Sequence, residues 1–142
     1  MISVEVEGID NVVRTLRELG RVGEEHLMLA LEETAIESTS IMKLNAPVVT
    51  NRLRSSIHYE KPNTRSFYYR DKEGKRYSGL FRERPRGVEV IVGTNVDYAE
   101  DVNMGARDPA KREFFEKGAK RARDMVDSRI RVNWEKAIKR VQ

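Results

Sequence analysis

The chain has 142 residues, of which 35% are charged and 39% hydrophobic, and none is a cysteine. This length predicts one domain, residues 1–142, that buries enough surface to fold without a covalent staple. The absence of cysteine excludes a disulfide scaffold and any thiolate metal site.

The sequence predicts neither a membrane span nor a leader. Its longest apolar run, residues 27–31, is far shorter than the roughly 20 residues that cross a bilayer. Met1 is followed by alternating apolar and polar residues, whereas a signal peptide would need an apolar block. We therefore expect a protein that is made in the cytoplasm and makes no membrane contact.

Net charge is +4 and the pI is about 9.4, which at first suggests a nucleic-acid binder. The charge is unevenly distributed, however. Residues 1–60 carry 6 basic and 10 acidic side chains, residues 61–87 carry 9 and 3, and residues 88–142 carry 12 and 10. The basic excess therefore belongs to one segment, which favours a projecting loop with a particular partner over a general polyanion binder.

The N-terminal residues predict a strand and a helix. Residues 2–6 alternate apolar and polar side chains, as in a half-buried strand, and Gly8 ends the run. Asp10 is a candidate N-cap for a helix, and Gly20 and Gly23 predict a break after it. The apolar positions of this helix are Val12, Val13, Leu16 and Leu19.

A longer helix is expected from about Glu24 to Leu44, and Pro47 ends it because the residue before a proline disfavours the α region. The middle of its apolar stripe is small, which predicts a close approach by another element. The stripe consists of Leu27, Leu31, Ala35, Ser38 and Met42.

Thr50 is a candidate N-cap for a short helical turn over residues 51–55, followed by a strand over residues 56–59. Leu53 and Ile57, four residues apart, are expected in the core. The basic segment 61–87 follows. A turn at residues 71–74 predicts that it forms a two-stranded hairpin arm with interleaved aromatics, namely Phe67, Tyr68, Tyr69, Tyr77 and Phe81.

The C-terminal half predicts a strand, a loop and a helix. Residues 87–93 predict a strand, and residues 96–104 a loop with a helical turn. Asp108 and Pro109 open the last section. A long amphipathic helix then carries Ala119, Ala122, Val126, Ile130, Trp134, Ala137 and Val141 at steps of three and four.

The unequal spacing of helices and strands excludes repeated βαβ units. We expect an α+β fold in which a small antiparallel sheet packs on a long central helix and a long C-terminal helix, with the basic hairpin arm projecting.

No residue pattern predicts catalysis. His26 lies beside Glu24 and Glu25 without a metal-binding motif, and His58 lies in a strand. The sequence around Gly93 matches no phosphate-binding loop, and no carboxylates have ligand-like spacing. We therefore expect no enzyme activity, no catalytic residue, no cofactor and no metal.

The basic arm is the candidate functional site. It could contact phosphate or an acidic protein surface while its aromatics stack on bases. Alternatively, the aromatics line one face of the hairpin and the charges keep the other face soluble. The candidate contact residues are Arg65, Arg70, Lys72, Lys75, Arg76, Arg82, Arg84 and Arg86.

Two segments carry a resemblance. The first is APVVTNRLRSSI, residues 46–57, directly after the long helix; the second is VIVGTNVDYAEDVNMGA, residues 90–106. Together with Gly8-Ile9-Asp10 they resemble, in order, the tail-completion or head–tail joining (connector) proteins of long-tailed phages and prophages. The motif positions are Pro47, Thr50, Leu53, Ile57, Gly93, Tyr98, Ala99 and Gly105.

Four positions depart from the family pattern. Asn51 stands where glycine is usual, and asparagine also tolerates a positive φ. Asn103 and Ala106 replace the usual glutamate and threonine, and no proline precedes Phe114. We expect Gly105 to permit a sharp exit before the last helix, and Tyr98 and Ala99 to pack over the end of the sheet.

The resemblance implies a virion structural protein made in the bacterial host cytoplasm. It would form a homo-oligomeric ring, with a hexamer expected, at the head–tail junction or the head-proximal end of the tail. Its partners would be neighbouring head-completion and tail-tube proteins, with transient contact to genomic DNA in the lumen. The alternative is a small DNA-binding module that acts through the arm at residues 61–87.

Overall fold

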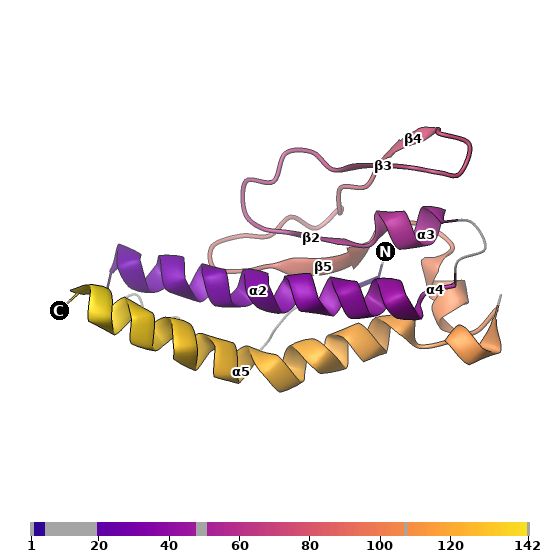
Figure 1. The fold of residues 1–142 in the computed structure, drawn as a ribbon. Helices are drawn as coiled ribbons and strands as arrows, with labels where there is room; N and C mark the ends of the chain where they lie inside the picture. Colours follow the sequence, from indigo (N-terminus) through magenta and orange to yellow (C-terminus); the bar gives the residue numbers. More distant parts are fainter. Residues whose placement is uncertain (1, 5–19, 48–50, 107, 142) are drawn as a thin grey trace.

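The structure, a computed structural model, describes residues 2–4, 20–47, 51–106 and 108–141. The fold is α+β, as expected: two long helices carry a small antiparallel sheet, above which lies a hairpin (Figure 1). The elements are β1 (Ile2–Val4), α2 (Arg21–Asn45), α3 (Arg52–Ser56), β2 (His58–Glu60), β3 (Tyr68–Arg70), β4 (Arg76–Ser78), β5 (Ile91–Thr94), α4 (Ala99–Asn103), a 3₁₀ turn (Pro109–Lys111) and α5 (Phe114–Val141).

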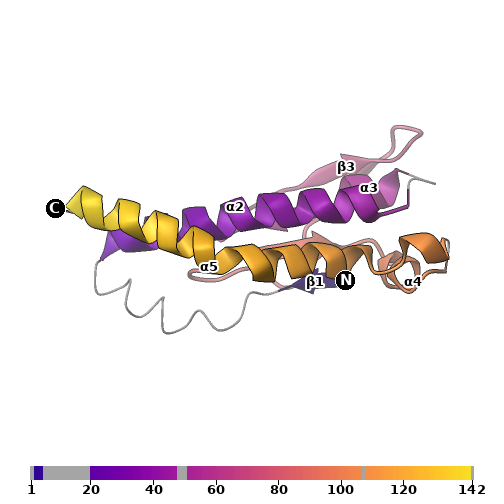
Figure 2. The ribbon, with the colours of Figure 1, turned by 60° about the horizontal axis from the view of Figure 1, so that its bottom comes forward.

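The helices α2 and α5 lie side by side and run in opposite directions over most of their length (Figures 1 and 2). All five positions of the predicted α2 stripe are buried, and so are the described positions of the α5 stripe except Trp134, which is half-buried. The 3.6-residue period thus located both packing faces correctly.

The close approach predicted from the small middle of the α2 stripe is present. Gly118 of α5 packs against α2, and a Cβ on Gly118 would lie 2.3 Å from Met42 Cγ and 2.7 Å from the Ser38 carbonyl oxygen. The Ser38 hydroxyl donates a hydrogen bond of 2.8 Å to the Gly118 carbonyl. The two backbones can come this close because neither residue carries a bulky side chain.

The three-stranded sheet has the order β1-β5-β2, with both pairings antiparallel. Its strands β2 and β5 lie between α2 and the arm segment (Figure 1). All four residues of β5 are buried, because α2 lies under one face and the arm segment over the other. The strand predicted over residues 87–93 begins later, at Ile91, because the ladder with β2 ends at the pair Glu60–Ile91.

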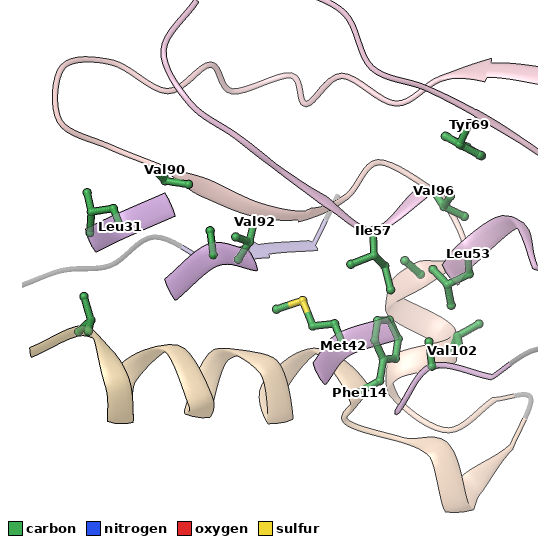
Figure 3. Close-up of a cluster of buried hydrophobic side chains, with 14 of the residues drawn as sticks. Leu31, Met42, Leu53, Ile57, Tyr69, Val90, Val92, Val96, Val102 and Phe114 are labelled. Atoms are coloured by element: carbon green, nitrogen blue, oxygen red, sulfur yellow. The ribbon is translucent and has the colours of Figure 1, made fainter. Parts of the chain in front are cut away.

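The described residues between α2 and β2 follow the predicted joints at Pro47 and Asn51. The helix α2 ends at Asn45, before Pro47, and Asn51 precedes α3 with a φ of 26°. A positive φ is what the asparagine in place of glycine predicted. Leu53 and Ile57 are both buried in the core (Figure 3).

The start of α5 is fixed by Asn103, a role that the sequence did not reveal. Its carbonyl accepts from the Glu113 amide at 2.7 Å and its side-chain oxygen accepts from the Phe115 amide at 3.0 Å. Its side-chain amide donates to Glu116 at 2.9 Å. These bonds satisfy amides that no helical carbonyl could reach, and they seat Phe114 in the core beside α4 (Figure 3).

Three predictions fall outside the described residues: the helix after Asp10, the end of the first strand at residues 5 and 6, and the N-cap role of Thr50. Of the helices that the structure describes, none combines the length and apolar character needed to cross a membrane.

Candidate functional site

The arm, residues 61–87, contains the predicted hairpin. Strands β3 and β4 pair antiparallel, with Tyr69 opposite Tyr77. The turn is built on Asp71, whose carboxylate accepts from the amides of Glu73 and Lys75 at 3.0 and 2.9 Å and from the Tyr77 hydroxyl at 3.0 Å. Partial desolvation opposes these bonds, yet together they hold the pKa of Asp71 below its usual value. The same hydroxyl bond raises the pKa of Tyr77.

The hairpin is held against α3 and α4 by Arg52. Its guanidinium lies 4.2 Å from the ring centre of Tyr77 and 5.6 Å from that of Tyr98, and its Nε lies 3.5 Å from the Tyr69 hydroxyl. Tyr69 and Tyr77 are stacked with their ring centres 5.4 Å apart. One cation thus joins two strands of the arm to the helices at the C-terminal end of α2.

The second attachment of the arm is a buried network around Glu60, which is 0% exposed. Its carboxylate accepts from His58 Nε2 at 2.7 Å, from the Phe81 amide at 3.0 Å and from Arg84 Nη1. The guanidinium of Arg84 also donates to the carbonyl of Thr64. Strand β2 is therefore tied to both legs of the arm through charged hydrogen bonds.

His58 fills the space between the two legs of the arm. Its ring is stacked on Phe67 with centres 3.7 Å apart and on Phe81 at 4.4 Å. Its Nδ1 lies 2.8 Å from the Ser56 carbonyl, so both ring nitrogens face acceptors. The ring is thus held by stacking on two aromatic side chains and by a hydrogen bond at each nitrogen.

The aromatic side chains of the arm mostly face inward, as the alternation of strand residues suggested. Tyr69 and Phe81 are buried and Phe67 and Tyr77 are half-buried, whereas Tyr68 is 51% exposed. Four of the five aromatics are therefore engaged in packing the arm onto the body. Tyr68 is the arm aromatic with an open face, and the Arg76 guanidinium lies 3.8 Å over its ring.

The eight candidate contact residues divide into two groups. Arg84 is half-buried and paired with Glu60, so its place in the structure is internal to the arm. The other seven are exposed: Arg65, Arg70, Lys72, Lys75, Arg76, Arg82 and Arg86. Proximity in sequence had grouped Arg84 with them, and only the fold placed its carboxylate partner within reach.

The motif residues that the structure describes, all but Thr50, lie at joints around one end of the fold. Gly93 is in β5, opposite Ser3 and His58. Ala99 is buried and Tyr98 half-buried where α4 meets the core. Gly105 has a φ of 96°, so the expected sharp exit before the last helix is present.

No metal-binding cluster is found in the described part of the chain. No group of three or more His, Asp or Glu side chains is placed to hold a metal ion there. His26 lies half-buried on α2, and its two ring nitrogens have no hydrogen-bond partner among the described residues.

Comparisons with protein-family models, with curated proteins and with solved structures each find no match to this chain. Any inference about function therefore depends on the ordered motifs of the sequence and on the geometry of the arm.

Proposed function

We propose that this chain is a virion structural protein of a long-tailed phage or prophage, located at the head–tail junction or the head-proximal end of the tail. The ordered motif set from Pro47 to Gly105 supports the proposal. The observation that carries it is the arm: its root is fixed to the body by Arg52 and Glu60, while seven basic side chains point outward. A rigid projecting arm is suited to contact with another subunit.

In this proposal identical subunits associate head to tail into a ring, with a hexamer as the expected form. A heterologous contact closes a ring when the rotation that relates neighbouring subunits is a whole-number fraction of a full turn. Head-completion and tail-tube proteins would adjoin the two faces of the ring. Genomic DNA would pass the basic side chains that remain in the lumen.

Electron microscopy combined with mass measurement tests the proposal. We expect rings of uniform subunit number, formed either by the chain alone at high concentration or on isolated tails. A chain that stays monomeric at high concentration and forms no ring with the products of neighbouring genes would contradict it. Portal, capsid and tail-tube genes beside this one are the expected genomic context.

The alternative function is DNA binding through the arm, which the seven exposed cations favour. Salt titration of binding to single- and double-stranded DNA tests it, because each neutralised phosphate adds about 0.7–0.9 to the slope of log K against log salt. Replacing Arg82 and Arg86 by alanine should lower this slope by about 1 for each phosphate that is no longer neutralised. Arg123→Ala, on the exposed face of α5, is the matched control. An unchanged slope would exclude both residues from phosphate binding.

A further inference from the structure

An open groove lies between the first half of α2 and the two ends of the arm segment. Its volume is about 710 Å³, within the range of about 300–1,000 Å³ found for pockets that hold a ligand-sized group. Met28, Leu29 and Val88 supply its apolar lining. Leu29 is 47% exposed, so its side chain offers apolar surface to a ligand in the groove.

Glutamates of α2 give the rim of this groove its acidic character. Glu24, Glu25 and Glu32 line it together with Arg21 and Lys61. Glu25 contacts Arg21 at 3.3 Å, and Glu32 contacts Lys61 at 3.3 Å, both at exposed or half-exposed positions. Glu25 also contacts Arg140 at 3.4 Å. Ion pairs at such exposed positions contribute little to stability, so an incoming cation can replace a cation paired with either glutamate.

The tip of the arm has the complementary character. Residues 70–76 contain four basic and two acidic side chains. Beside them the stacked pair Tyr68 and Arg76 offers an exposed aromatic ring covered by a guanidinium. Tyrosine and arginine are the residue types enriched where interfaces gain most of their affinity.

The groove and the tip lie at opposite ends of the molecule. The groove adjoins the N-terminal end of α2, whereas the hairpin lies over α3 at the other end (Figures 1 and 2). From Glu25 to Asn45 the helix extends about 30 Å at 1.5 Å per residue. The tip therefore cannot reach the groove of its own chain, but it can reach that of a second copy.

We propose that the tip of the arm, residues 70–76 with Tyr68, binds the α2 groove of the next copy of this chain. Two different complementary surfaces at opposite ends of one subunit produce a head-to-tail contact, which is the type that builds rings. This inference deepens the proposed function and rests on it, because it assigns the surfaces through which the ring would form.

Cysteine crosslinking tests the contact without interference from native thiols, since the chain contains no cysteine. Leu29→Cys marks the groove, and Glu73→Cys marks the exposed turn while leaving all four basic side chains of the tip in place. The two single variants, one enlarged by a tag, are mixed and mildly oxidised. We expect a mixed dimer in about tenfold excess over the control pair Glu73→Cys and Ser128→Cys, in which Ser128 is exposed on α5.

An equal yield from the control pair, or no mixed dimer either at high concentration or on isolated tails, would overturn the contact. Charge reversal supplies a second measurement. Lys72→Glu with Lys75→Glu should lower the crosslinking yield severalfold, and Glu24→Lys with Glu25→Lys in the partner should restore it. A yield unaffected by the first reversal would contradict the role of charge complementarity.

The same experiment separates this contact from the proposed function. A double variant carrying both cysteines should give a ladder of crosslinked species that stops at the number of subunits in the ring. A ladder that continues without closing supports the contact but contradicts a ring. If the unmodified chain forms rings but the double variant gives no Leu29–Glu73 crosslink, the proposed function stands and the contact is overturned.

Discussion

Replacing Glu60 by glutamine is the most informative single change, because it removes one charge and leaves the shape of the side chain almost unchanged. The Glu60 carboxylate is 0% exposed and receives three donors, from His58, the Phe81 amide and Arg84. Each carboxylate oxygen accepts at least one of them. A glutamine has one oxygen and one NH₂ group, so in either orientation its NH₂ group faces a donor.

The expected cost follows from these hydrogen bonds. If the amide nitrogen takes the position facing His58 and Phe81, the Phe81 amide is left without an acceptor. If it takes the position facing Arg84, the charge-assisted hydrogen bond to the guanidinium is lost. An unsatisfied buried donor costs about 1–3 kcal/mol, and a hydrogen bond to a charged group contributes about 1.5–3 kcal/mol. Arg84 is 37% exposed, so water replaces part of its bond to the carboxylate. We therefore expect Glu60→Gln to lower the free energy of unfolding by about 3 kcal/mol.

Urea unfolding followed by circular dichroism measures this difference. With a slope of about 2 kcal/mol per molar urea, the midpoint should fall by about 1.5 M. Trypsin should also cut the arm faster, because the network holds both of its legs. Glu73→Gln, at the exposed turn, is the matched control and should change stability by less than about 0.5 kcal/mol. A Glu60→Gln protein with an unchanged midpoint and unchanged cleavage would refute the reasoning.

Three further predictions concern backbone packing and the turn of the arm. Gly118→Ala should lower the free energy of unfolding, measured by thermal unfolding, by about 2 kcal/mol. Overpacking against Met42 costs about 1–3 kcal/mol, the strained Ser38 hydrogen bond costs about 1 kcal/mol more, and the higher helix propensity of alanine offsets about 1 kcal/mol. A stabilised variant would contradict the close approach of the two helices. Glu113→Gly should stabilise by up to about 1 kcal/mol, because Glu113 has a φ of 60°; a loss of stability in urea unfolding would contradict this. The pKa of Asp71 is lowered by folding, so its contribution is present above the unfolded value of 3.8 and is lost as pH falls through the folded pKa. The protection factor of the Lys75 amide against hydrogen exchange should therefore fall below about pH 4 in the native protein but stay constant in Asp71→Asn.

Local patterns were sufficient to predict most elements. The spacing of Leu27 to Met42 and of Ala119 to Ala137 predicted both long helices and their buried faces. The turn at residues 71–74 predicted the hairpin, and Asn51 predicted the positive φ before α3. These features depend on interactions between residues that are close together in the chain, so they can be recognised from the sequence alone.

The partners of the charged residues could not be predicted in the same way. Arg84 and Glu60 are 24 residues apart, and Arg52 meets Tyr77 across the arm. Nothing in the sequence distinguishes Arg84 from the exposed Arg82 and Arg86, because the difference arises only where the chain folds back on itself.

The sequence alone thus determined the order of the elements, the apolar faces of the helices and the concentration of basic charge in residues 61–87, since each is a property of composition or of a short period. The tertiary structure decided which of those charges remain available to a partner. Burial and pairing are set by contacts between distant segments, and these contacts make Arg84 part of the root of the arm and leave the other seven candidate contact residues on its surface.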